Sequence, residues 1–220
     1  MERNLVRKGI LFVLMGPTGS GKTTFCNRLL SEFSETLHYS VSATSRPIRE
    51  GEVSGKSYHF LNRAEFLERA GAGEFFEWEE THGNLYGTLR STLLDGINGG
   101  RDLLFQIDIR GALNFKRAFP NNTVTVFILP PSFTDLKGRL RNRGTVDREE
   151  LAKRFGTAQQ EYESLLGLSG DTGKVDYLVV NRDLQETYEQ IRSVVISERA
   201  RYHRMDLPSV RQFCEVEAGE

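Results

Sequence analysis

One contiguous stretch of this chain has residue types and spacing that are typical of phosphate binding. Residues 16–23 read GPTGSGKT and match the pattern G-x-x-x-x-G-K-[ST] without exception. The glycines allow the backbone to turn so that successive N–H groups point at phosphate oxygens, and a helix start adds positive potential. In this arrangement Lys22 reaches the β and γ phosphates of a nucleotide and Thr23 ligates Mg²⁺. A plain glycine-rich turn is the alternative, but the bare pattern should arise by chance in on the order of 1% of chains of this size.

A second group of polar side chains lies between residues 40 and 58. Arg46 and Arg49 are three positions apart there, and Tyr58 and several hydroxyl side chains occur among glycines. A forked guanidinium group can hold a phosphate through two hydrogen bonds, and a tyrosine can donate a further one. The loop is therefore a candidate for binding a second phosphate. A solvated loop with surface arginines is the alternative.

Composition restricts the kinds of partner. The 220 residues include 29 Lys and Arg against 30 Asp and Glu, and the resulting net charge of −1 argues against a strongly basic nucleic-acid surface. The longest apolar run, residues 10–15, is far shorter than the roughly 18 residues that a transmembrane helix needs. Cys26 and Cys214 form no paired or metal-binding pattern, which predicts a reducing, cytoplasmic location. We expect neither nucleic acid nor membrane as a partner, and protein partners stay unidentified.

Short apolar runs followed by helical patterns must position these residues. Residues 10–15 are continuous and apolar, end at the glycine-rich loop and lead into a helical stripe over 21–33. The further predicted strands are 103–107, 124–129 and 177–180, and the helices that follow them are 112–118, 133–140 and 184–202. Apolar strands that alternate with helices predict an α/β fold, a parallel sheet of the P-loop NTPase type with helices on both faces.

The segment between the first two of these strands has a different texture and predicts an inserted mixed α+β subdomain. Residues 40–100 are rich in Arg, Glu, Tyr and Gly, with strand-like residues at 75–78 and a helical pattern over 64–70. Residues 141–155 are polar and basic, as in a mobile lid. From 207 to 220 we find no periodicity and expect a weakly ordered tail. The core would then comprise residues 1–39, 101–140 and 156–206.

Several separate motifs, in order and with similar spacing, resemble those of guanylate kinases. They are residues 40–58, then EFFEW at 74–78, GNLYGT at 83–88, RLRNRGT at 139–145 and VNRDL at 180–184. The resemblance covers roughly residues 9 to 202. It implies phosphoryl transfer from ATP to GMP with Mg²⁺, and an insert that binds GMP.

The resemblance also implies a role for each matched residue. ATP would be held by Gly16, Pro17, Thr18, Gly19, Ser20, Gly21, Lys22, Thr23, Thr24 and Asn181, with Mg²⁺ on Thr23. The phosphate of GMP would be held by Arg46, Arg49, Tyr58 and Tyr86, and its guanine by Ser42, Glu77, Thr88 and Asp108. The residues implied in catalysis are Lys22, Arg46, Arg139, Arg143 and Arg154, the last three as lid arginines that stabilise charge on the transferred group. A carboxylate such as Glu77 can accept the adjacent N1–H and N2–H of guanine, whereas adenine presents an acceptor at N1.

One position departs from the family pattern. Guanylate kinases usually carry two aspartates separated by one residue where this chain has Gln106 and Asp108. Alternate residues of a strand share a face, so we expect both side chains to point the same way at the carboxyl end of the sheet. An amide brings no charge to Mg²⁺, and this predicts altered metal handling and turnover.

Two other functions fit parts of the pattern. A binding module of guanylate-kinase fold would keep Arg46, Arg49 and Tyr58 for a partner phosphopeptide but would not need the loop at 16–23. A related kinase that acts on another phosphorylated acceptor, such as a sugar phosphate, would keep the arginines but give Glu77 no guanine to contact.

Overall fold

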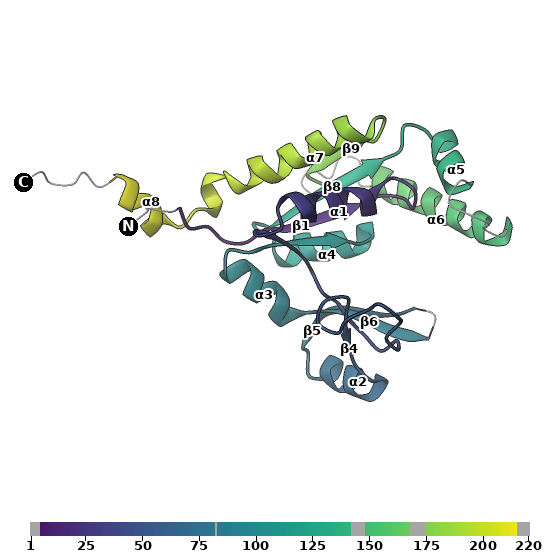
Figure 1. Ribbon diagram of the computed structural model, residues 1–220, viewed down its shortest axis with the longest axis horizontal. Helices are drawn as coiled ribbons and strands as arrows, with labels where there is room; N and C mark the ends of the chain where they lie inside the picture. The colour runs from purple at the N-terminus through teal and green to yellow at the C-terminus, as the bar shows by residue number, and fades with distance from the viewer. Residues whose placement is uncertain (1–4, 82, 142–147, 168–174, 215–220) are drawn as a thin grey trace, which may run out of the picture.

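The computed structural model describes residues 5–81, 83–141, 148–167 and 175–214, and this part of the chain contains two separate β-sheets (Figure 1). The larger sheet has five parallel strands in the order β2-β7-β1-β8-β9, and the smaller sheet is mixed, in the order β4-β3-β6-β5. The predicted α/β fold with a parallel sheet is confirmed.

The central strands of the large sheet follow from their continuous apolar sequence. β1 (Leu11–Met15) is buried along its whole length and lies between β7 (Asp102–Gln106) and β8 (Thr123–Leu129). β9 (Tyr177–Val180) forms one edge, next to β8. The other edge, β2 (Leu37–Tyr39), is not among the predicted strands, because three residues are too short to show a pattern.

Helices cover both faces of the large sheet. On one face, α1 (Lys22–Glu32) and α7 (Leu184–Arg199) bury Phe25 and Ile191 against β1 and β8. On the other face, α3 (Arg90–Asn98) and α4 (Ile109–Ala118) bury Leu93 and Phe115. α5 (Phe133–Arg141) and α6 (Arg148–Leu166) pack on each other beside this body.

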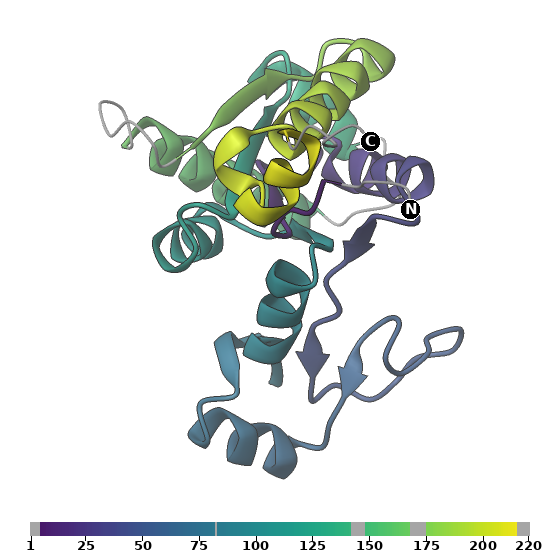
Figure 2. The same cartoon turned by 90° about the vertical axis from the view of Figure 1, so that its left-hand side faces the viewer.

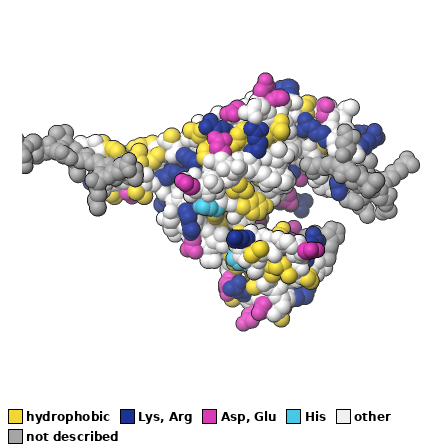
Figure 3. Space-filling view, in the orientation of Figure 1, with side chains coloured by type: hydrophobic (Ala, Val, Ile, Leu, Met, Phe, Trp, Pro, Cys, Tyr) yellow, Lys and Arg dark blue, Asp and Glu magenta, His cyan; other side chains and the backbone are white. Residues whose placement is uncertain are grey.

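The smaller sheet belongs to a lobe with its own hydrophobic core (Figure 2). Its strands are β3 (Ala43–Thr44), β4 (His59–Phe60), β5 (Phe75–Thr81) and β6 (Asn84–Leu89), and its helix is α2 (Arg63–Gly71). Phe66 stacks on Phe75 at 4.3 Å between ring centroids. A notch separates this lobe from the large sheet in the space-filling view (Figure 3). We call it the insert lobe.

The prediction of a tail without regular structure from residue 207 is wrong for its first eight residues. α8 (Leu207–Cys214) forms there, following a short 3-10 helix (Tyr202–Arg204) after the end of α7. The Ser209 amide donates to the Asp206 carboxylate at 2.9 Å, and the Ser209 hydroxyl accepts from the Val6 amide at 3.1 Å. An acidic N-cap and a contact with the N-terminal segment thus stabilise a helix that the pattern of apolar residues does not predict.

A buried carboxylate ties the N-terminal segment and the end of α7 to the sheet. Asp102, at the start of β7, is fully buried and accepts from both terminal nitrogens of Arg7, at 2.6 and 2.7 Å. It also accepts from Arg199 of α7 at 2.7 Å and from the Ile10 amide at 3.0 Å. This anchor lies far along the strands from their carboxyl ends. Among the described residues, no helix is long and apolar enough to cross a membrane.

Candidate functional site

The glycine-rich loop lies between the end of β1 and the start of α1, where the sequence predicts it. Gly16 has a φ of +129°, and a Cβ there would lie 2.2 Å from the carbonyl oxygen of Ile128. Gly21 is the N-cap of α1 and has a φ of +105°, a conformation that favours glycine. As a glycine it has no side chain to cap the helix. The first turn of α1 also contains no acidic residue. The amides at this helix start therefore meet no carboxylate of their own first turn, which suits an anionic ligand.

Lys22 folds back onto its own loop in this structure. Its ammonium group donates to the carbonyl oxygens of Gly16 and, at 3.2 Å, Pro17. The charge is thus held at the rim of the loop by neutral acceptors. A phosphate presents stronger acceptors for the same donors.

A cavity of about 480 Å³ opens beside this loop. We call it the loop cavity; its lining is Gly19, Gly21, Thr24, Arg139, Asn181, Arg182, Asp183 and Leu184. The Asn181 side chain donates to the Ser20 carbonyl at 2.8 Å, and Arg139 donates to the Asn181 carbonyl at 2.9 Å. The end of β9, the loop and α5 are therefore held together by predicted site residues.

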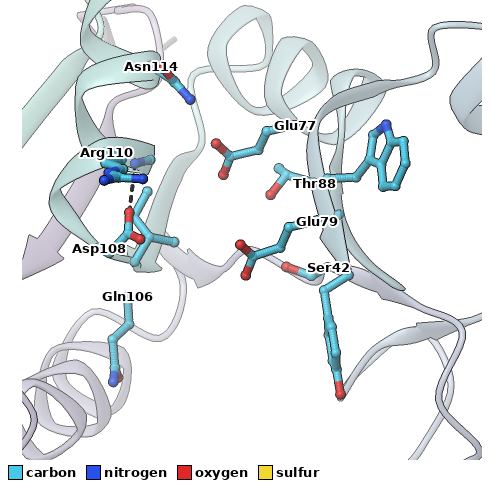
Figure 4. Close-up of a pocket in the computed structure, with 13 residues that line it drawn as sticks. Ser42, Glu77, Glu79, Thr88, Gln106, Asp108, Arg110 and Asn114 are labelled. Atoms are coloured by element: carbon cyan, nitrogen blue, oxygen red, sulfur yellow. Dashed lines mark hydrogen bonds between the residues drawn. The ribbon is translucent and has the colours of Figure 1, made fainter. Parts of the chain in front are cut away.

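A second cavity, of about 520 Å³, lies between the insert lobe and the carboxyl end of the large sheet (Figure 4). We call it the interlobe cavity. It is lined by Ser42, Glu77, Trp78, Glu79, Tyr86, Gly87, Thr88, Gln106, Ile107, Asp108, Arg110, Gly111 and Asn114. The structure thus brings five of the eight residues predicted for GMP to one cavity.

Besides Gln106, three charged or amide side chains of this cavity are absent from the predicted set. Glu79 shares a face of β5 with Glu77, and Arg110 and Asn114 lie one turn apart on α4. Strand alternation and helical spacing could have identified them, once one residue of each element was assigned to the site.

Glu77 points from the insert lobe toward α4 and meets Asn114 and Asp108 across the cavity (Figure 4). Burial raises the pKa of the Glu77 carboxyl, and the negative charges of Asp108 and Glu79 raise it further. A hydrogen bond from Asn114 acts in the opposite direction and lowers that pKa. Glu77 is a desolvated carboxylate whose charge is supported by an amide donor.

Residues 46–52, which we call the arginine loop, fold around the carboxylate of Glu52. Arg46 holds Glu52 through two hydrogen bonds of 2.7 and 3.0 Å, and the Arg49 amide donates to the same carboxylate at 2.8 Å. The hydrogen bond with Glu52 raises the pKa of Arg46, while Arg46 lowers the pKa of Glu52. The Arg46 guanidinium lies 5.5 Å from the ring centroid of Tyr58.

Tyrosine rings connect this loop to the interlobe cavity. Tyr58 and Tyr86 are 6.1 Å apart at their ring centroids, and Tyr86 lines the cavity. Arg46, Tyr58 and Tyr86 are therefore brought together, whereas Arg49 joins them here through its backbone amide.

The strand alternation used to orient Gln106 and Asp108 does not apply to Asp108. β7 ends at Gln106, and Asp108 is the N-cap of α4, where its side chain accepts from the Gly111 amide at 2.8 Å. A capping carboxylate ends the strand before alternation can apply. Both side chains nevertheless line the interlobe cavity, and Gln106 lies 3.3 Å from the Thr23 hydroxyl.

The predicted lid arginines are distributed over two helices. Arg139 lies on α5 and lines the loop cavity, and Arg154 lies on α6. Arg143 falls in residues 142–147, outside the described residues.

Known proteins resemble this chain over nearly its whole length. A family model for guanylate kinase matches residues 8–198. Guanylate kinases from Thermotoga maritima and Nitratidesulfovibrio vulgaris are 41% and 43% identical to it over 197 and 192 residues, which is 90% and 87% of this chain and 91% and 88% of theirs. The crystal structure of guanylate kinase from Anaplasma phagocytophilum matches with a TM-score of 0.70 at 31% identity, covering 97% of each chain.

Proposed function

The chain belongs to the guanylate kinase family and transfers a phosphoryl group from ATP to GMP, and we propose that ATP binds along the loop at 16–23 while GMP fills the interlobe cavity. The observation that carries this assignment is the position of the two cavities. One is lined by the loop and the other by Glu77, Thr88 and Asp108. Gln106 also lines the second cavity, and its amide oxygen accepts from the hydroxyl of Thr23, the loop residue next to Thr24 of the first cavity. The phosphates of the two nucleotides would then meet at the carboxyl end of β7, next to Lys22.

On the donor side, the loop amides and Lys22 bind the phosphates of ATP. Lys22 leaves the Gly16 and Pro17 carbonyls for the β and γ phosphates, which are stronger acceptors. Asn181 lies at the adenine end of the loop cavity, and its contact with Ser20 keeps the loop in place. Arg139, Arg143 and Arg154 neutralise charge on the transferred group.

On the acceptor side, the arginine loop and the tyrosines hold the phosphate of GMP. Glu52 already occupies two donors of Arg46, so the phosphate takes the remaining donors of Arg46, the side chain of Arg49 and the two tyrosine hydroxyls. Glu77 accepts N1–H and N2–H of guanine. Ser42, Thr88 and Asp108 complete the contacts to the base.

The oxygen donors beside the loop fit Mg²⁺. The Thr23 hydroxyl and the Gln106 amide oxygen are 3.3 Å apart, and the Asp108 carboxylate lines the same cavity. Mg²⁺ binds oxygen ligands and commonly combines one or two carboxylates with substrate phosphates. When bound, the ion neutralises charge on the ATP phosphates.

Transfer needs no nucleophilic side chain. A phosphate oxygen of GMP attacks the γ-phosphorus of ATP, the bond to the β–γ bridging oxygen breaks, and ADP leaves with that electron pair. The residues of this chain act by alignment and charge neutralisation. We propose that residues 40–100 act as the GMP-binding subdomain and 141–155 as the lid, and that both close on the core to exclude water.

Acceptor choice is tested by measuring ADP formation with GMP, AMP, UMP and a sugar phosphate. We expect turnover with GMP alone at equal concentrations, because AMP leaves the desolvated Glu77 facing an acceptor nitrogen. Comparable rates with a sugar phosphate would contradict the base contacts. Silence with every acceptor would favour the phosphopeptide-binding alternative.

The raised pKa of Glu77 predicts how GMP binding depends on pH. Only the ionised carboxylate accepts both guanine N–H groups, so kcat/KM for GMP should fall with decreasing pH, starting closer to neutrality than an ordinary glutamate would allow. The phosphate of GMP also titrates, near about pH 6. Glu77→Gln is the control, because it retains the phosphate titration and should lose the additional dependence. Identical pH profiles for the two proteins would contradict the assignment.

We also propose a cytoplasmic location. Cys26 is buried and Cys214 is exposed, and neither is in a disulfide. Both observations are consistent with a reducing compartment.

A further inference from the structure

One carboxylate of α6 lies on the side of the helix that faces the site, and the mechanism above does not use it. Residues 154, 158, 161 and 165 fall on one side of α6, because they are three or four positions apart. Ala158 of this set is buried, and Leu165 packs against the core cluster of α4 and β7. Glu161 therefore lies between two apolar contacts, on the same side as Arg154.

This side of α6 lies next to the glycine-rich loop. Ala158 packs with Leu136 and Leu140 of α5 in one small cluster. Leu136 and Leu140 in turn border the loop, since a Cβ at Gly19 would lie 3.0 Å from the Leu136 side chain. Because α6 packs on α5 and α5 packs on the loop at 16–23, Glu161 lies on the side of α6 nearest to that loop.

This packing leaves one oxygen of the Glu161 carboxylate without a hydrogen-bond donor among the described residues. That oxygen, Oε2, is buried. Burial raises the pKa of Glu161, the positive charge of Lys22 lowers it, and the negative charge of Asp108 raises it. Both Lys22 and Asp108 are hence within electrostatic range. A buried acceptor without a donor costs stability, so its retention here needs a reason.

The other oxygen-bearing side chains near the loop suggest that reason. Gln106, beside the Thr23 hydroxyl, brings an amide and no charge. Asp108 is partly committed to capping α4 through its bond with the Gly111 amide. Glu161, by contrast, has one carboxylate oxygen without a hydrogen-bond partner among the described residues, and it interacts electrostatically with Lys22 and Asp108.

We propose that Glu161 is a positioning residue for the magnesium nucleotide, and that its carboxylate supplies, from α6, the negative charge that Gln106 does not bring beside Thr23. The inference rests on the proposed placement of ATP on the loop. This role can be distinguished from a purely structural one. A negative charge beside the phosphates strengthens nucleotide binding only when the metal ion is present, whereas a structural residue acts with or without the ion.

The test uses Mn²⁺ as the probe for the metal ion, with a non-hydrolysable ATP analogue and the full-length protein. Glu161→Gln keeps the size of the side chain and removes its charge. We expect electron paramagnetic resonance titration to give a Mn²⁺ dissociation constant in the ternary complex about tenfold higher than wild type. In EDTA, without metal, the analogue should bind as tightly as to wild type or more tightly, since repulsion from the carboxylate is gone. The melting temperature should not fall, because an unpaired buried acceptor has been made neutral.

Two further variants complete the test. Glu163→Gln is the matched control: it lies on the same helix, is exposed, bonds to Gln159 and should leave all three measurements unchanged. Gln106→Asp should tighten Mn²⁺ in the wild-type background and restore it in Glu161→Gln. A Mn²⁺ constant in Glu161→Gln equal to wild type, or a joint loss of stability and metal-free nucleotide binding, would overturn the inference. If wild type binds no nucleotide, the placement of ATP fails first, and the inference with it.

Discussion

Lys22→Ala is expected to abolish measurable turnover, with kcat lowered by at least about 10²–10³-fold, the loss typical of removing one preorganised donor from a developing negative charge. The lysine is the first residue of α1, at the carboxyl end of β1, and this helix start has neither a capping side chain nor an acidic residue in its first turn. Two of its hydrogen bonds go to the Gly16 and Pro17 carbonyls, which are neutral and belong to the loop itself. These two hydrogen bonds can be exchanged for bonds to phosphate without displacing a charged partner. ADP formation with saturating ATP and GMP measures the effect.

Two variants separate this role from a loss of positive charge or of stability. Lys22→Arg keeps the charge but places a planar fork where a compact ammonium group fits, so it should also lose most activity. Lys8→Ala removes an exposed lysine just before the opposite end of β1 and should leave kcat within about twofold, as ordinary surface substitutions do. An unchanged rate in Lys22→Ala would contradict the donor site proposed here.

The sequence predicts those parts of the fold that depend on contiguous residues. β9 begins and ends as predicted, at Tyr177 and Val180, because its four residues form an unbroken apolar run, even though the strand lies at the edge of the sheet. The loop at 16–23 needs no distant partner to be identified, since strand, glycines and helix start follow one another. β2 was not predictable in this way. It belongs to the sheet through pairing of Leu37 with Asp102, a contact between residues far apart in sequence.

The candidate site likewise contains residues that local motifs predict and residues that only long-range packing places there. Glu77 and Thr88 lie opposite each other on β5 and β6, and the motifs that contain them predict both. The position of Asp108 depends on where β7 ends, and its own capping bond to Gly111 decides that. Asn114 enters the site only because α4 lies across the cavity from β5, which no local pattern encodes. Long-range packing thus contributes the side of the cavity that faces Glu77.

Glu77→Ala is expected to weaken GMP strongly and ATP hardly at all. The carboxylate is proposed to accept two hydrogen bonds from guanine, and bonds to charged groups contribute about 1.5–3 kcal/mol each. Their loss should raise KM for GMP by roughly 10²-fold or more, because about 1.4 kcal/mol corresponds to a tenfold change in an equilibrium constant. KM for ATP should stay within about twofold, since Glu77 lies in the interlobe cavity and not in the loop cavity. Initial rates with each substrate varied in turn measure both constants.

The neighbouring residue Glu80 provides the matched control. It lies on the same strand three positions on, where it is exposed and bonds to Arg63 at 2.8 Å outside the cavity. Glu80→Ala removes the same charge from β5 and should leave KM for GMP close to wild type, so a change common to both variants would indicate a general electrostatic effect. Equal losses of GMP and ATP affinity in Glu77→Ala would indicate a disturbed fold, and they would count against Glu77 as the residue that selects guanine. A selective loss of GMP instead requires that the insert lobe contact the base through this side chain, because the arginine loop and its phosphate contacts are untouched by the substitution.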